Sequence, residues 1–421
     1  MRRLSSLFSF LVILFSFYFA GSIVFQHNLS AQQKTEKKDK KGKSSEKEDT
    51  KKKATQSGPA KIDMPKPEEK EVSRDELADK KRDEAIKMLK DIITRFEKGP
   101  KKADVMFQLA ELYWEKSKYV YFQEMYEYEK KLDECNKKTK DMSACEKIKI
   151  NTRQSELYRK QALDIYEKII KEYPDYPRKD EVLFILGYNL YEMGRKNDGV
   201  KYYWELIKKY PQSKYAPDAY LSLGEHFFNN NEVFKAVQAY EKALTFNDPK
   251  ITTVALYKLA WCDYNLGEYE KGIEKLKQVI QFAQKESEKS KIKLEREAMN
   301  DLALFFSQVD AVDEAKDYWE KVAGRQRLKD LLKLLAKVYD DQGKYDQAIK
   351  TYRMVINEYP NAPECPEFQS NIVQNYKKLN NTEMVKKEIR RLVDLYKPNS
   401  PWANQNAENK FALEKAYELT E

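Results

Sequence analysis

The sequence predicts an all-α fold in which antiparallel helix pairs stack one after another into an array. One pattern, written LGYNLYEMGRKNDGVKYYWELIKKYP at residues 186–211, recurs in six variants as far as residue 393. Each variant keeps small and bulky residues at fixed positions, and proline closes three of them, at positions 211, 249 and 360. Because proline lacks the N–H that would extend a helix, each of these prolines marks the end of a helix pair.

The fixed positions have a simple physical meaning. Successive first small residues are 37, 36, 43, 33 and 37 positions apart, and a second small residue and a bulky residue follow twelve and sixteen positions later. Small residues let two helices approach closely, and the bulky side chain fills the space between neighbouring pairs. The first small residues are Gly187, Gly224, Ala260, Ala303 and Ala336, with Val373 in the last variant; the second are Gly199, Ala236, Gly272, Ala315 and Ala348; the bulky residues are Tyr203, Tyr240, Leu276, Trp319 and Tyr352.

This pattern resembles the tetratricopeptide repeat (TPR) family, whose units span about 34 residues. The resemblance implies a right-handed superhelical TPR solenoid, expected over residues 73–397, that binds partners and is seldom an enzyme. An earlier unit is interrupted, with its first helix at residues 103–114 and its second at 161–174. The inserted residues 115–160 are rich in Tyr, Lys and Glu and lack Pro and Gly, which predicts a long helical-hairpin insertion in the first full repeat.

The N-terminus predicts export from the cytoplasm. Arg2 and Arg3 precede an apolar run over residues 7–25, the layout of a signal peptide, which we expect at residues 1–31. The run is also long enough for an uncleaved membrane anchor. Under either interpretation the array is periplasmic or otherwise extracytoplasmic, and an uncleaved run would tether it to the membrane.

A disordered linker is predicted after the signal, over residues 32–72. Residues 34–71 hold thirteen lysines and nine acidic residues and no aromatic side chain, too little apolar surface to offset chain entropy. Residues 34–71 contribute +4 to the net charge of +9 and Arg2 with Arg3 contribute +2, which leaves +3 for the rest of the chain, so the folded array is nearly neutral. Nucleic acid is therefore an unexpected partner, because it requires a basic stripe on the folded surface.

The sequence offers no catalytic, cofactor or metal site. No catalytic motif is present, and the two histidines are His27, near the signal, and His226, on a predicted amphipathic helix. No two cysteines have zinc-ligand spacing. We therefore expect a protein that is not an enzyme and holds no cofactor.

The four cysteines have different expected roles. Cys135 and Cys145 lie inside the insertion, and in an oxidising compartment they are the natural disulfide, which would pin two long helices together at the hairpin tip. The alternative is two free surface thiols. Cys262 is interpreted as a small packing residue, and Cys365 receives no role.

The TPR resemblance also implies where partners bind, since the first helix of each TPR unit lines a concave groove. In the first four units these positions are mostly aromatic, which favours capture of an extended or helical peptide, although individual rings can instead pack between helices. The predicted groove residues are Phe107, Trp114, Phe184, Tyr188, Tyr191, Phe228, Tyr257, Trp261 and Tyr264, together with Leu221. Later units hold Asn300, Gln308, Lys333, Lys337, Asp340, Asp341, Gln374 and Lys377 at these positions.

A narrower resemblance concerns function. The segments AELYWEKSKYVYFQEMYEYEKKLDEC and YAPDAYLSLGEHFF resemble TPR proteins of the adventurous gliding motility type in Gram-negative bacteria. This resemblance implies a scaffold for protein partners of the cell envelope. Residues 210–220 are also similar to outer-membrane assembly lipoproteins and Tol-associated TPR proteins, so the alternative is a periplasmic factor that handles outer-membrane protein or cell-wall substrates. A C-terminal helix is expected at residues 398–421, and the oligomeric state is left open.

Overall fold

The computed structural model describes residues 74–421, apart from residues 139–144, 146 and 286–288. The predicted signal peptide and linker lie outside the described residues. Within them the chain forms sixteen α-helices and no β-strand, which confirms the predicted all-α fold.

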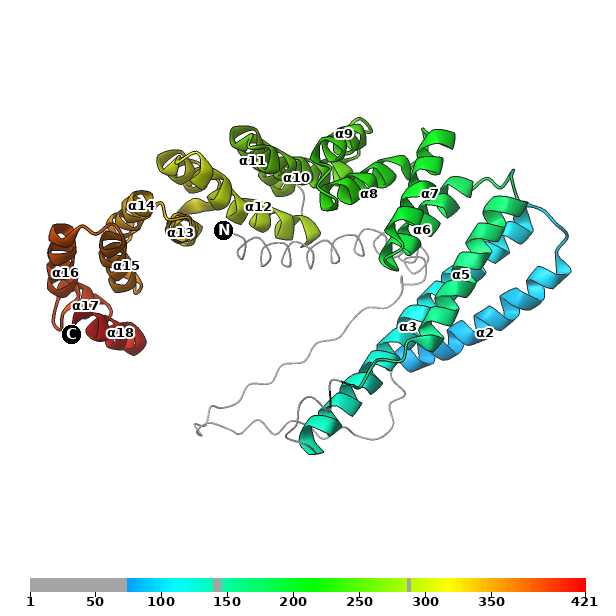
Figure 1. The fold of residues 1–421 in the computed structure, drawn as a ribbon, viewed down its shortest axis with the longest axis horizontal. Coiled ribbons are helices and arrows are strands. Elements are labelled where there is room, and N and C mark those ends of the chain that lie inside the picture. Colours follow the sequence, from blue (N-terminus) through cyan, green and yellow to red (C-terminus); the bar gives the residue numbers. More distant parts are fainter. Residues whose placement is uncertain (1–73, 139–144, 146, 286–288) are drawn as a thin grey trace, which may run out of the picture. The chain divides into compact units, whose positions relative to one another are not determined.

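Successive helices pack against one another from α2 to α17, and most of them form short antiparallel pairs (Figure 1). This is the arrangement that the repeated pattern predicts, because each helix buries one face against the next helix in the chain. The helices are α2 (Arg74–Arg95), α3 (Pro100–Lys138), α5 (Arg153–Glu172), α6 (Lys179–Glu192), α7 (Lys196–Lys209), α8 (Ala216–Asn229), α9 (Val233–Leu244), α10 (Pro249–Leu266), α11 (Tyr269–Gln284), α12 (Lys289–Gln308), α13 (Val312–Asp341), α14 (Tyr345–Glu358), α15 (Cys365–Lys378), α16 (Thr382–Tyr396), α17 (Pro401–Gln405) and α18 (Lys410–Thr420).

The fixed positions of the repeat form the interior of each helix pair. A Cβ atom added to Gly199 of α7 would lie 2.5 Å from the carbonyl oxygen of Gly187 in α6, so the two backbones are in contact there. The bulky residue Tyr203 closes the same contact and is buried. The equivalent residues Tyr240 and Trp319 are fully buried as well. The repeat is therefore a packing requirement that recurs once in every unit.

Helix α13 contains two repeat helices, the second helix of one unit and the first of the next. They are joined at Gly324, whose φ of 71° and ψ of 167° belong to a region that only glycine adopts readily. Other units use a loop at this junction, such as residues 210–215 between α7 and α8. The one-residue junction explains why the spacing from Ala303 to Ala336 is the shortest in the array.

The insertion differs from the predicted pair of long helices. The outgoing helix is long, since α3 runs for 39 residues without interruption, but residues 147–152 of the return are not helical. Helix α5 starts where Glu124 of α3 accepts hydrogen bonds from the backbone N–H groups of Gln154 and Ser155, at 3.1 and 3.2 Å. A carboxylate that caps a helix N-terminus satisfies N–H groups that otherwise lack partners. This contact across the hairpin sets the start of α5, and the local sequence does not reveal it.

The C-terminal segment also differs from its prediction. The single helix expected at residues 398–421 is two helices, α17 and α18, each capped at its start by the side chain of Ser400 or Asn409. The indole of Trp402 donates a hydrogen bond to the Ala362 carbonyl at 2.9 Å, and α18 packs on α15 and α16. These contacts hold the segment against the preceding unit.

Candidate partner-binding face

Three of the predicted groove residues lie in the hydrophobic core. Leu221 is 7% exposed and belongs to the cluster that includes Ala236 and Tyr240. Phe107 is 0% exposed, with its ring 5.8 Å from that of Tyr166, and the guanidinium of Arg178 lies 4.4 Å above it. Phe184 is 7% exposed and packs against the rings of Tyr203 and Tyr215. The prediction is wrong for all three. Loop residues that precede the next first helix fold over Phe107 and Phe184, and Leu221 packs inside its own helix pair.

The other seven aromatic residues are half-buried on α3, α6, α8 and α10, so each offers part of its ring to the surface. We call them the first-helix face, and their role in binding stays a prediction. The first-helix face comprises Trp114, Tyr188, Tyr191, Phe228, Tyr257, Trp261 and Tyr264.

The structure brings three residues of this face together around a phenylalanine that sequence reasoning missed. Phe305 of α12 is fully buried, and its ring lies 5.4 Å from that of Trp261 and 4.9 Å from that of Tyr264. Tyr257 donates a hydrogen bond to Asp301 of α12 at 2.6 Å. The face therefore has a preorganised aromatic cluster where α10 meets α12.

Asp301 places a carboxylate beside this cluster. Burial raises the pKa of Asp301 to about 6, and hydrogen bonds from Tyr257 and Trp261 partly oppose this shift. A carboxylate next to half-buried rings can accept a donor or a cation from a bound chain.

A second set of residues, which we call the acidic–aromatic row, occupies the same position of the repeat in four successive units. The residue directly after the first small residue is Glu111, Tyr188, Glu225 and Trp261 in successive units, and all four are half-buried. The repeat alignment contains this alternation, but a search for aromatic residues alone passes over the two glutamates.

The two glutamates of the row differ in their surroundings. Burial raises the pKa of Glu111 to about 7, with the charge of Arg178 opposing this shift. Glu225 of α8 forms an ion pair with Lys258 of α10. Within the described residues, the row therefore holds one carboxylate without an ion pair, Glu111, and one that already has a partner, Glu225.

Comparison with known proteins identifies the family. A family model for the tetratricopeptide repeat matches residues 334–362, and one for a tetratricopeptide repeat-like domain matches residues 159–290. Both spans contain the helix pairs described above. The chain is a tetratricopeptide repeat protein.

Several solved structures are similar to this TPR protein. A tetratricopeptide repeat protein from Parabacteroides merdae is 15% identical, with a TM-score of 0.36, covering 63% of this chain and 93% of its own. The C-terminal part of a TPR repeat-containing protein from Cytophaga hutchinsonii is 15% identical, with a TM-score of 0.36, covering 76% and 99%. YrrB, described as a TPR protein with an unusual peptide-binding site, is 14% identical, with a TM-score of 0.28, covering 49% and 97%. No curated protein matches the sequence significantly.

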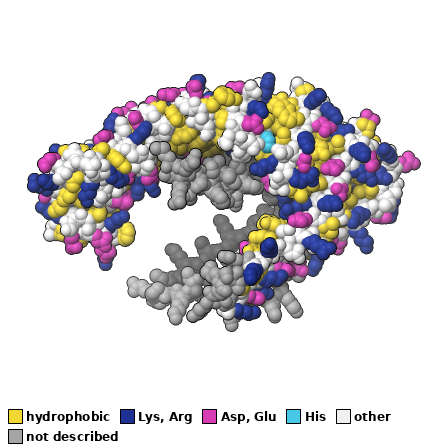
Figure 2. Space-filling model, viewed as in Figure 1, with side chains coloured by type: hydrophobic (Ala, Val, Ile, Leu, Met, Phe, Trp, Pro, Cys, Tyr) yellow, Lys and Arg dark blue, Asp and Glu magenta, His cyan; other side chains and the backbone are white. Residues whose placement is uncertain are grey.

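The later units of the TPR array present a polar surface at the same register. Asn300, Lys337 and Gln374 are exposed, and Asp340 forms an ion pair with Lys378 at 2.6 Å. On the side shown in Figure 2, basic and acidic side chains are interspersed over the described part of the chain. That side offers no basic stripe of the kind that nucleic-acid binding requires.

The cysteines occupy two kinds of site. Cys135 at the end of α3 and Cys145 in the return are joined by a disulfide, with 5.8 Å between their Cα atoms. Cys262 and Cys365 are free and buried, and burial raises the pKa of each thiol to about 12. Their thiols are therefore poor nucleophiles at neutral pH.

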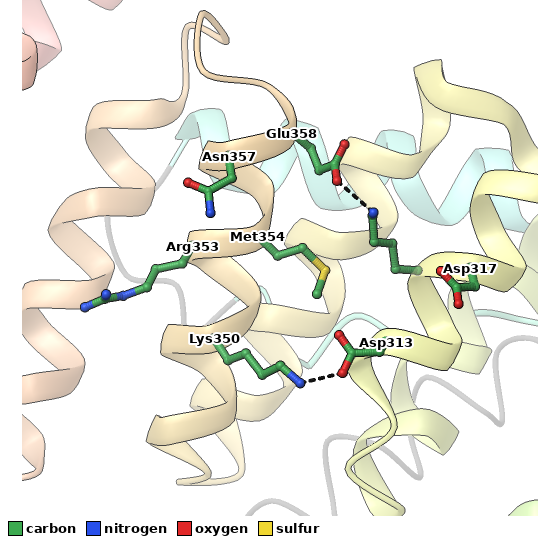
Figure 3. A pocket seen from close by; sticks show the side chains of 8 residues that line it. Asp313, Asp317, Lys350, Arg353, Met354, Asn357 and Glu358 are labelled. Atoms are coloured by element: carbon green, nitrogen blue, oxygen red, sulfur yellow. Dashed lines mark hydrogen bonds and ion pairs between the residues drawn. The ribbon is translucent and has the colours of Figure 1, made fainter.

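A hollow of about 450 Å³ lies between the second helices of two units, in the first part of α13 and in α14 (Figure 3). Lys316 pairs with Glu358 at 2.7 Å and Lys350 with Asp313 at 2.6 Å across it. Arg353 points away from the hollow and pairs with Glu388 of α16. Because most of its charges are neutralised in pairs, the hollow offers little to a charged ligand.

Neither a metal centre nor a membrane span is found in the described part of the chain. No group of three or more His, Cys, Asp or Glu residues there could hold a metal ion. None of the helices described is long and apolar enough to cross a membrane.

Proposed function

We propose that this TPR protein is a non-enzymatic scaffold that acts outside the cytoplasm and binds protein partners through its first-helix face. The observation that carries the proposal is the set of seven half-buried aromatic residues on four first helices. Partly exposed aromatic rings supply large, rigid contact areas, and such residues are enriched where protein partners bind. TPR units are in general interaction modules, which agrees with a non-catalytic role.

The disulfide supports the proposed location. Disulfides persist in oxidising compartments and are rare in the cytosol, so the Cys135–Cys145 bond fits an exported protein. The export signal predicted at residues 1–31 agrees with this location. We infer that the partners are proteins of the cell envelope, in a gliding-type or related assembly, as the resemblance implies. A role in handling outer-membrane protein or cell-wall substrates would use the same face.

The proposal is tested by crosslinking and affinity purification of the full chain from envelope fractions of its native host. The test variant replaces Tyr188, Trp261 and Tyr264 with Ala. The matched control is Phe234→Ala on the second helix α9, where the ring is 73% exposed. We expect the triple variant to lose partners that the control retains, and circular dichroism to show that both variants are folded.

The outcome also separates the two roles. Recovery of the components of one envelope assembly favours the scaffold, whereas recovery of many outer-membrane precursors or cell-wall enzymes favours substrate handling. If the folded triple variant keeps every partner, the first-helix face is not the binding surface. Because Trp261 and Tyr264 pack against Phe305, Tyr188→Ala is also tested alone, as a variant that leaves the contacts of Phe305 in place.

A further inference from the structure

We propose that the acidic–aromatic row selects a segment of a partner protein in which Lys or Arg side chains alternate with apolar side chains at three-residue intervals. This inference rests on the proposed function and names the chemistry of the partner. The row is Glu111, Tyr188, Glu225 and Trp261, one residue from each of four successive first helices.

The spacing of the row determines the conformation of the bound segment. Packed helices lie about 8–10 Å apart, and we infer a similar separation between neighbouring row positions. A polyproline II segment has three residues per turn and rises about 9 Å per turn, which places every third side chain on one face. In a β-strand, successive side chains point to opposite faces. Side chains three residues apart would therefore point in opposite directions, and every second one would face away from the row.

Contacts between neighbouring first helices connect α6, α8, α10 and α12, and the charges of Arg178 and Glu181 at the start of α6 act on Glu111 of α3. The rings of Tyr191 in α6 and His226 in α8 lie 6.2 Å apart. Glu225 of α8 and Lys258 of α10 form an ion pair, and Trp261 of α10 contacts Phe305 of α12. A single segment can therefore cross successive units without leaving the face.

Charge complementarity favours a cation opposite Glu111. Arg178 lies near this carboxylate but forms its ion pair with Glu181 at 2.7 Å, so no cation in the described residues is paired with Glu111. The other titratable groups that face Glu111 are Glu115 of α3 and Tyr166 of α5. A half-buried carboxylate without an ion pair gains more from an incoming ammonium or guanidinium group than a solvated one.

Glu225 and Trp261 extend the same preference. Glu225 already forms an ion pair with Lys258. A cation from the partner would therefore gain less binding free energy there than at Glu111. Tyr188, between the two acidic positions, and Trp261, beyond the second, accept apolar side chains, and Asp301 adds a carboxylate beside Trp261. The occupant we infer is a segment of another protein. The lysine-rich residues 34–71 of this chain supply cations but few apolar side chains.

The test measures binding of fluorescein-labelled probe peptides to the full chain by anisotropy. The probe is (KPPLPP)₂, which places Lys and Leu alternately at three-residue intervals in a polyproline II chain. Matched peptides replace Lys with Gln, Lys with Glu, or Leu with Ser. We expect the Lys/Leu probe to bind about tenfold more tightly than the Gln/Leu peptide, and the Glu/Leu peptide to bind most weakly.

Variants of the protein assign the preference to the row. Glu111→Gln should remove most of the difference between the Lys/Leu and Gln/Leu peptides, and Glu225→Gln should remove a smaller part. Glu241→Gln, an exposed change on the second helix α9, is the matched control and should leave both affinities unchanged. Affinity for the Lys/Leu probe should rise from pH 6 to pH 8 as Glu111 ionises, and this dependence should disappear in Glu111→Gln.

Three results would overturn the inference in distinguishable ways. Equal binding of the Lys/Leu and Gln/Leu peptides, lost in Trp261→Ala, removes the cation preference and leaves the proposed binding face intact. If deletion of residues 34–71 strengthens probe binding several-fold, the chain's own segment occupies the row and the assignment to a partner is wrong. Binding of none of the peptides rejects the inferred partner chemistry, and the purification experiment then decides the proposed function independently.

Discussion

Helix α6 and the second part of α13 hold the same core position but present different surfaces. Gly187 of α6 and Ala336 of α13 are both buried against the second helix of their unit. The next residue is half-buried Tyr188 in α6 and exposed Lys337 in α13. Packing constrains the core position in every unit, whereas the adjacent surface position is free to vary, so differences in binding along the array arise there.

Two kinds of contact connect neighbouring units along the array, since ion pairs such as Glu225–Lys258 also occur early and aromatic contacts such as Tyr352–Phe368 also occur late. In the early units the connections include aromatic contacts, such as that between Phe184 and Tyr215. In the later units lysines bridge to acids about one repeat away, as Lys344 does to Asp310 and Lys378 to Asp340. Aromatic burial resists salt and pH, whereas exposed ion pairs are weak and screened. The two kinds of contact should therefore respond differently to substitution and to solution conditions.

The largest effect is expected from a change in the shared core. Gly199→Ala introduces a Cβ atom 2.5 Å from the Gly187 carbonyl oxygen, which the rigid backbone cannot accommodate. We expect the free energy of unfolding to fall by about 3 kcal/mol, measured by urea denaturation. Gly99→Ala is the control, because its Cβ would meet nothing within 4 Å. Equal stability of the two variants would contradict the close-approach account of the repeat.

A pH experiment compares one register position in the early and late units. Burial and the nearby Asp248 raise the pKa of Asp218 to about 7, above the value of about 3.9 in an unfolded chain. The folded state therefore favours the protonated form, and the free energy of unfolding is greatest below pH 4 and falls as pH rises through 7. Asp218→Asn should stabilise the protein by roughly 2 kcal/mol at pH 8 and by little at pH 4.

The control for this experiment is Asp330→Asn, at the same register in α13, where the side chain is exposed. It should leave the pH dependence of thermal unfolding unchanged. If both variants respond alike, the burial of Asp218 does not distinguish the two ends.

The third effect concerns the insertion, which belongs to the early end alone. Replacing Cys135 and Cys145 with Ser should cost at most about 3 kcal/mol in local stability, because the bond closes a short loop. Limited proteolysis should become faster within residues 120–152 and stay unchanged in residues 325–421. The denatured, unreduced protein should show two free thiols, those of Cys262 and Cys365, and a count of four would contradict the disulfide.

The smallest effect is expected at the late end. Lys378→Gln removes the ion pair with Asp340 and should cost about 0.5 kcal/mol at low salt. The difference from the unmodified protein should disappear in 1 M salt, where the Debye length is about 3 Å. Hydrogen exchange in α15 measures the loss of stability at low salt and its disappearance in 1 M salt. A loss that persists in high salt would show that Lys378 acts through packing of its side chain.

Several features of the candidate site could be predicted from the sequence because they depend on register. The alignment places Tyr188, Trp261 and Tyr264 on the first helices, and the structure finds each of them half-buried. Glu111 and Glu225 occupy the same register and could have been found by reading every residue type at that position. Phe305 could not, because it lies on α12, the first helix of the next unit, and approaches Trp261 only when the units stack.

The sequence by itself determined that this protein is an array of helix pairs, because small and bulky residues at fixed intervals allow only close packing of two helices in each unit. Tertiary structure decided which aromatic residues face outward. Phe107 and Trp114 both hold groove positions of the same helix, yet Arg178 covers Phe107 and leaves Trp114 half-buried. The start of α5 at Glu124 was decided in the same way. Such contacts join residues far apart in the chain, and a repeat period describes only the packing that recurs within each unit.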